Sequence, residues 1–106
     1  MAKNYEQFDL EEDTTVAERK KLKTPRKYCV IFHNDDFTTQ EFVVHVLQNF
    51  FYKNQDDAIV LMLRIHQEGR AVVGSYTKDV AESKATVATV YCRKNGMPLL
   101  ITSEPA

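Results

Sequence analysis

The stretch His33–Phe42, HNDDFTTQEF, concentrates oxygen acceptors directly after an apolar run. Asn34 offers an amide oxygen, and Asp35 and Asp36 offer two neighbouring carboxylates. A turn before a helix requires fewer acids than this, although Asn and Asp also bond to their own backbone in turns. The stretch is therefore a candidate site for a positively charged group.

A protonated amine is one candidate ligand, because it carries three N–H donors and binds where acceptors converge beside negative charge. Asn34 and Asp35 supply two acceptors, and a neutral His66 would supply a third. Met62, Ile65 and His66 share one face of a predicted helix, since their spacing is i, i+3 and i+4. A histidine at the edge of a core face, bonded to a backbone carbonyl, is the structural alternative for His66.

A metal ion is the second candidate ligand. Mg²⁺ commonly binds one or two carboxylates together with substrate phosphates, so a small metal-dependent enzyme could use Asp35, Asp36 and His66. The sequence has no glycine-rich phosphate loop, no further paired acids that would complete a catalytic site and no serine or cysteine in a nucleophile motif. We therefore expect no catalysis, no metal and no other cofactor. A plain interaction domain, in which the acidic turn is only structural, is the third interpretation.

The composition excludes several classes of protein. At 106 residues and 43% hydrophobic residues, the chain has room for one domain with a single core. A formal net charge of −1 disfavours nucleic-acid binding, which needs a clustered basic surface. No apolar run approaches the roughly 18 residues of a membrane span, and Cys29 and Cys92 lack the spacing of a metal or redox pair. We expect a cytoplasmic monomer with reduced thiols and no nucleic-acid or membrane partner.

Residues 1–25 differ in composition from the rest of the chain. Acids cluster from Glu6 to Glu18 and bases from Arg19 to Lys27, with few apolar residues among them. Such a segment buries too little surface to offset the entropy of ordering. The sequence therefore predicts a flexible N-terminal extension over 1–25 and a folded core domain over 26–106.

Three short runs rich in aromatic, β-branched and other apolar residues predict strands. They cover residues 28–32, 71–76 and 99–102. Apolar residues at helical spacing predict two helices between the first two runs and one helix between the last two. The order β-α-α-β-α-β predicts an α+β single domain, in which three helices pack on a small, mainly antiparallel three-stranded sheet.

Capping residues give the expected bounds of the first two helices. The first helix starts with a capping box of Thr38 and Glu41 and ends near Phe51. The second helix follows a cap at Asn54 and stops at Gly69. Its apolar residues lie largely on one side, which we expect to be buried; they are Ala58, Ile59, Met62 and Ile65.

The third helix follows a predicted cap at Thr77 and ends at Asn95. Its expected buried stripe comprises Val80, Ala81, Val87, Ala88, Tyr91 and Cys92. The charged side, with Asp79, Glu82 and Lys84, is expected to be solvated, and it could also dock a partner through complementary charge.

Three segments together resemble the ClpS family, the adaptors of the Clp AAA+ protease. They are VIFHNDDFTTQEFVVHVLQNFF, AIVLMLRIHQEGRAVVGSYTKDVAESK and MPLL. The resemblance runs from about Pro25 to near the C-terminus, and the acidic-then-basic extension fits it too. It implies a non-enzymatic adaptor that binds proteins with a bulky N-terminal residue, such as Leu, Phe, Tyr or Trp. It also implies transfer of these proteins to a Clp unfoldase, whose N-terminal domain would be the partner.

The resemblance also implies roles for individual residues. Asn34, Asp35 and His66 would hold the α-amino group of the substrate. The pocket for its first side chain, including the rim, would be formed by Asp36, Thr38, Gln40, Val43, Met62, Ile65 and Leu99. The residues that dock the unfoldase would be Asp79, Glu82 and Lys84. Gln40 stands at a rim position where Met is expected in well-known members of the family.

Overall fold

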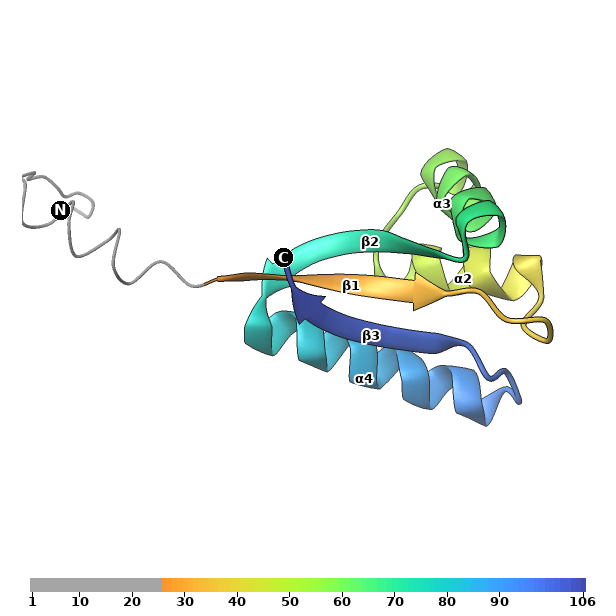
Figure 1. Ribbon diagram of the computed structural model, residues 1–106. Helices are drawn as coiled ribbons and strands as arrows, with labels where there is room; N and C mark the ends of the chain where they lie inside the picture. Colours follow the sequence, from red (N-terminus) through yellow and green to blue (C-terminus); the bar gives the residue numbers. More distant parts are fainter. Residues whose placement is uncertain (1–25) are drawn as a thin grey trace, which may run out of the picture.

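A computed structural model describes residues 26–106, which contain three strands and three helices (Figure 1). The elements are β1 (Lys27–His33), α2 (Gln40–Phe50), α3 (Gln55–Glu68), β2 (Arg70–Thr77), α4 (Lys78–Lys94) and β3 (Leu100–Pro105). The predicted α+β fold and its β-α-α-β-α-β order are confirmed. The predicted flexible extension, 1–25, lies outside the described residues.

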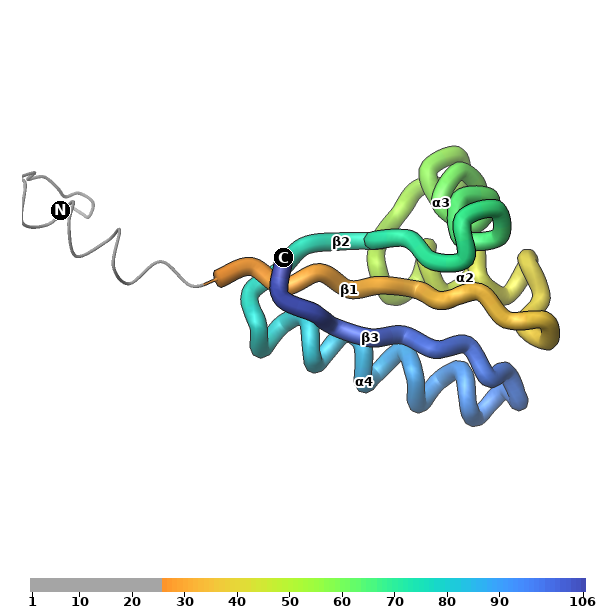
Figure 2. The backbone as a smooth tube through the Cα atoms, in the orientation of Figure 1, coloured from red at the N-terminus to blue at the C-terminus, as the bar shows by residue number. Residues whose placement is uncertain are grey.

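The strand β1 is the centre of an antiparallel sheet with the order β2-β1-β3. Phe32 on β1 pairs with Ala71 on β2 and with Ile101 on β3. Figure 2 shows the backbone passing from β1 through a turn into α2, and from α3 back into β2. The acidic turn therefore begins at the end of the most constrained strand of the sheet.

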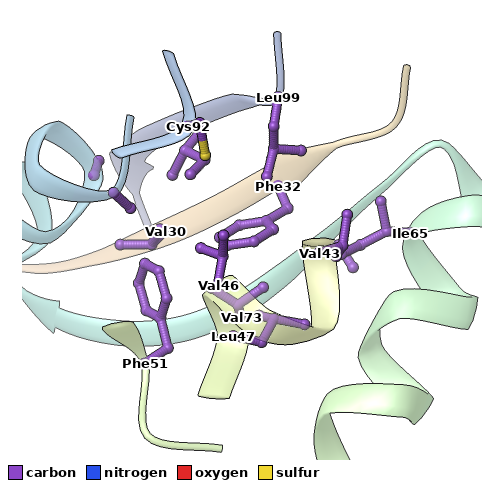
Figure 3. Packing of buried hydrophobic residues seen from close by; sticks show 14 of the residues in the cluster. Val30, Phe32, Val43, Val46, Leu47, Phe51, Ile65, Val73, Cys92 and Leu99 are labelled. Atoms are coloured by element: carbon purple, nitrogen blue, oxygen red, sulfur yellow. The ribbon is translucent and has the colours of Figure 1, made fainter. Parts of the chain in front are cut away.

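The core lies between the sheet and the helices. Val30 and Phe32 are fully buried, and because they are two residues apart on a strand they point to the same face of the sheet. Figure 3 shows Val46, Phe51 and Leu99 around them. The rings of Phe32 and Phe51 meet edge to face, with centroids 5.4 Å apart, so β1 is fixed against the end of α2.

The helix α2 begins one residue later than the capping-box prediction implied. Its N-cap is Thr39, whose hydroxyl oxygen accepts a hydrogen bond from the Phe42 backbone N–H at 3.1 Å. The predicted cap at Thr38 is wrong, because the Thr38 hydroxyl donates to the Asp35 carboxylate at 2.8 Å instead. Thr38 therefore belongs to the turn that precedes the helix, and Thr39 caps the helix.

The predicted ends of α3 are confirmed. The Asn54 side chain accepts from the Asp57 backbone N–H at 2.8 Å, and Gly69 ends the helix in the left-handed region with φ of 89°. The prediction for its buried side was partly wrong, since Ile59 is 37% exposed whereas Ile65 is buried.

The predicted buried stripe of α4 is also partly wrong. The buried residues are Ala81, Ala85, Ala88 and Cys92, whereas Val80 and Val87 are 43% and 55% exposed. Small side chains on the buried stripe let the helix lie close to the sheet, and the larger valines beside the stripe face solvent. The prediction was based on hydrophobicity alone, whereas the buried positions of α4 also require small side chains.

Cys29 and Cys92 are free thiols, Cys92 being buried and Cys29 partly buried. Within residues 26–106, every helix is too short or too polar to cross a bilayer.

Replacing Asn54 by Ala should lower the free energy of unfolding by about 1 kcal/mol, because the Asp57 N–H loses its acceptor. Urea denaturation monitored by circular dichroism measures this change. Thr77→Ala is the matched control, since Thr77 is the N-cap of α4 but makes no side-chain cap hydrogen bond. Thr77→Ala should lower the free energy of unfolding clearly less than Asn54→Ala does. Equal decreases in the two variants would contradict the assigned role of the Asn54 side chain.

Candidate functional site

A cavity of about 200 Å³ lies between the β1–α2 turn and one face of α3. Its lining residues are Asn34, Asp35, Asp36, Thr38, Gln40, Val43, Met62, Ile65 and His66. The structure thus brings the acidic turn and the histidine-bearing face of α3 to one place. The cavity is smaller than the ~300–1,000 Å³ pockets of drug-sized ligands, so it suits one side chain rather than a large cofactor.

Leu99 is the one predicted pocket residue that is not among the lining side chains. It is 1% exposed and packs in the core, where Figure 3 shows it beside Phe32. Its contribution to the pocket stays a prediction.

A backbone hydrogen bond holds the turn against the end of α3. The Asn34 N–H donates to the Gly69 carbonyl oxygen at 2.8 Å. Gly69 directly follows the last turn of α3, which carries His66. The bond therefore keeps the polar side chains of the turn close to the end of α3 that carries the imidazole.

The Asp35 carboxylate organises the turn. Its Oδ1 accepts from the backbone N–H groups of Phe37 at 2.8 Å and Thr38 at 2.7 Å, and its Oδ2 accepts from the Thr38 hydroxyl at 2.8 Å. A carboxylate has about four lone-pair positions. Two on Oδ1 and one on Oδ2 are used, so Oδ2 keeps one for a ligand.

The charge of Asp35 is stabilised by the same contacts. Burial raises the pKa of this carboxyl, but the hydrogen bonds from Thr38 and Phe37 and the positive charge of Arg93 outweigh burial. The net effect holds the pKa of Asp35 below its ordinary value of 3.8. The cavity therefore contains a fixed negative charge at neutral pH.

Three other side chains that line the cavity are apolar. Val43 from α2 and Ile65 from α3 are buried, and Met62 from α3 is partly buried. Gln40, the first residue of α2, is exposed. The cavity can thus accommodate a ligand that carries a cation directly beside an apolar group.

The metal interpretation required Asp35, Asp36 and His66 to converge as ligands. Among residues 26–106 there is no group of three or more His, Cys, Asp or Glu side chains placed to hold a metal ion. Asp35 Oδ1 instead accepts hydrogen bonds from two backbone N–H groups of its own turn, those of Phe37 and Thr38.

The predicted docking residues lie on α4, away from the cavity. Asp79 and Glu82 line a shallow hollow with Ser83 and Val87. Figure 1 shows that α4 starts at the end of the sheet opposite to the acidic turn. A partner could therefore bind this part of α4 while the cavity is occupied.

The Lys84 side chain is held by contacts with residues outside α4. Its ammonium donates to the Phe50 carbonyl at 3.3 Å and lies 5.7, 5.0 and 5.4 Å from the ring centroids of Phe51, Tyr52 and Tyr76. These contacts connect α4 to the segment between α2 and α3. Part of the effect of any Lys84 substitution will therefore be structural.

Arg93 is a residue near the site to which the sequence analysis assigned no role. Its guanidinium donates to the carbonyl oxygens of Met97 at 3.0 Å and Leu99 at 2.9 Å, and its charge lowers the pKa of Asp35. A basic residue in the last turn of a helix commonly bonds free carbonyls. This rule was the signal that could have identified Arg93.

A model of the family described as ATP-dependent Clp protease adaptor protein ClpS matches residues 23–102. The chain belongs to the ClpS family. It is 40% identical to the ClpS of Vibrio cholerae serotype O1 over the full length of both chains. It is 46% identical to the ClpS of Myxococcus xanthus over 99 residues, which cover 90% of this chain and 92% of that protein.

A solved ClpS-family structure also resembles the fold described above. Agrobacterium tumefaciens ClpS2 bound to L-phenylalaninamide matches with a TM-score of 0.76 and 40% identity. The match covers 77% of this chain and 99% of that chain. The family resemblance drawn from the sequence is thereby confirmed, and ClpS proteins are adaptors of the ATP-dependent Clp protease.

The Asp35–Thr38 interaction predicts the effect of two substitutions. Thr38→Val should raise the pKa of Asp35, because it removes the hydroxyl donor, whereas Thr38→Ser should leave it low. NMR titration of the Asp35 side-chain carboxyl measures both values. The same low value in Thr38→Val as in the wild type would contradict the role of this hydrogen bond.

The stability of the variants should depend on pH in a defined direction. A carboxyl with a depressed folded-state pKa stabilises the fold above its unfolded pKa, and this contribution is lost as the pH falls through the folded pKa. The wild type should therefore have a higher free energy of unfolding than Thr38→Val at neutral pH. This difference should become smaller as the pH falls below 3.8, the ordinary pKa of an aspartate.

Proposed function

We propose that this protein is a non-enzymatic adaptor that binds proteins with a bulky hydrophobic N-terminal residue and delivers them to a Clp AAA+ unfoldase. The observation that carries the proposal is the cavity, which is lined both by a fixed carboxylate and by apolar side chains. An N-terminal residue has this combination, since its α-ammonium group is separated from its side chain by a single carbon. We expect the protein to act in the cytoplasm.

The α-ammonium would bind three acceptors. Asp35 would contribute the free lone pair of Oδ2, Asn34 its amide oxygen and His66 a neutral ring nitrogen. Because the Asp35 carboxylate is already fixed by Phe37 and Thr38, little side-chain entropy remains to be lost on binding. An ammonium has three donors, so this arrangement would satisfy all of them.

The first side chain of the substrate would enter the apolar part of the cavity against Val43, Met62 and Ile65. The cavity volume of about 200 Å³ favours Leu, Phe, Tyr and Trp over small residues, which would leave part of it empty. Each missing CH₂ costs roughly 0.8 kcal/mol of apolar burial. The ligand L-phenylalaninamide of the related ClpS2 supports the proposal, because it combines a free α-amino group with an aromatic side chain.

A peptide that begins with Leu should bind at least about 30-fold more tightly than its N-acetylated form. Acetylation removes the charge and leaves Asp35 without its partner, which costs ~2 kcal/mol or more. Fluorescence anisotropy with a C-terminally labelled peptide measures both dissociation constants. Equal affinities would refute the proposed recognition of the α-amino group.

Asp35→Asn should weaken binding of the free Leu peptide by about tenfold or more. The asparagine oxygen can still accept from Phe37 and Thr38, but its NH₂ group replaces the acceptor that faces the ammonium. Asp79→Asn is the matched control, because it removes the same charge on α4, away from the cavity. A similar loss in both variants would show a general charge effect instead of a specific contact.

Delivery would depend on Asp79, Glu82 and Lys84, which we propose contact the N-terminal domain of the unfoldase. Asp79 and Glu82 are exposed, and complementary charge across an interface mainly increases specificity and the association rate. Residues 1–25 would act in delivery and not in peptide binding.

Asp79→Lys should weaken binding to the N-terminal domain of a ClpA-like unfoldase, more strongly at low than at high salt, because exposed charges are screened. Peptide affinity should not change. Surface plasmon resonance at two salt concentrations measures the effect, with Glu104→Lys on β3 as the control for charge reversal. If Glu104→Lys weakened binding to the N-terminal domain as much as Asp79→Lys does, the proposed docking surface on α4 would be contradicted.

A further inference from the structure

A second hollow lies next to the cavity, on the outer surface of α2 and α3. Its volume is about 360 Å³, and its lining residues are Gln40, Glu41, Val44, Ile59 and Met62. Gln40 and Met62 also line the first cavity. These two side chains therefore form a wall that the two hollows share.

The wall of the second hollow is mainly apolar. Val44 and Met62 are partly buried against the core, and Ile59 is 37% exposed. Ile59 is the residue that helical spacing placed in the core, and the structure turns it toward this hollow instead. Neither Val44 nor Ile59 lines the first cavity, so the proposed α-amino site does not account for them.

We propose that this second hollow binds the side chain of the third residue of the substrate, with a preference for an apolar one. The inference rests on the function proposed above, in which the first side chain fills the cavity. In an extended chain the first and third side chains point to the same side, about 6.6 Å apart, while the second points away. Two hollows that share a wall on one surface would therefore receive the first and the third side chain.

The charge at the edge of the hollow adds a second preference. Glu41 is exposed and lines the hollow, and no base lines it. An acidic side chain at the third position would therefore lie beside a like charge. The site should accept Leu or Phe there and disfavour Asp or Glu.

Three labelled peptides test the proposal. They begin Leu-Ser-Leu, Leu-Leu-Ser and Leu-Ser-Ser and continue with one common neutral tail. Leu-Ser-Leu should bind about fivefold more tightly than Leu-Ser-Ser, as expected for partial burial of one leucine. Leu-Leu-Ser should stay within about twofold of Leu-Ser-Ser. The first two peptides have the same composition, so their difference isolates the position of the leucine.

Two variants locate the effect. Ile59→Asn should remove most of the fivefold preference while leaving the affinity for Leu-Ser-Ser unchanged. Val60→Asn is the matched control, because Val60 is a neighbouring β-branched residue of α3 that is 54% exposed and lines neither hollow. It should retain the preference.

The outcomes separate this inference from the function on which it rests. Equal affinities for Leu-Ser-Leu and Leu-Ser-Ser, or an equal gain from Leu-Leu-Ser, would overturn the third-residue site. If free Leu-Ser-Ser still bound more tightly than its acetylated form, the α-amino site would stand. Loss of the preference in both Ile59→Asn and Val60→Asn would also overturn the assignment to this hollow.

Discussion

The hydrogen bonds of the Asp35 carboxylate are the interaction on which the rest of the site depends. Two backbone N–H groups and one hydroxyl, from Phe37 and Thr38, fix the carboxylate and keep it ionised. They also take Thr38 out of the helix, so that α2 starts from a cap at Thr39. One side chain thereby sets the start of a helix, the shape of a turn and the charge of a cavity.

The sheet and α3 hold this turn in place. β1 is paired on both sides, and Phe32 near its end is packed in the core, so the turn begins from a rigid point. The bond from the Asn34 N–H to the Gly69 carbonyl then joins the turn to the end of α3. Because both anchors are backbone or core contacts, side chains at the cavity surface can vary while the acceptors keep their positions. Gln40 is such a surface residue.

Local signals predicted the fold better than they predicted the site. Asn54 and Gly69 were correct as helix ends because their effects depend only on neighbouring backbone. Two adjacent threonines could each have capped α2, and only the contact with Asp35 decides between them. The convergence of Asn34 with His66 rests on a bond across 35 positions of the chain, which spacing does not reveal. The family resemblance supplied that pairing.

We propose above all that an α-ammonium group binds to Asp35 beside an apolar wall. A crystal structure of this protein with L-phenylalaninamide tests it most directly. We expect the ligand nitrogen at about 2.7–3.2 Å from Asp35 Oδ2, the Asn34 amide oxygen and an imidazole nitrogen of His66, with the ring against Val43, Met62 and Ile65. A ligand bound elsewhere, or in the cavity with its nitrogen turned away from Asp35, would contradict it.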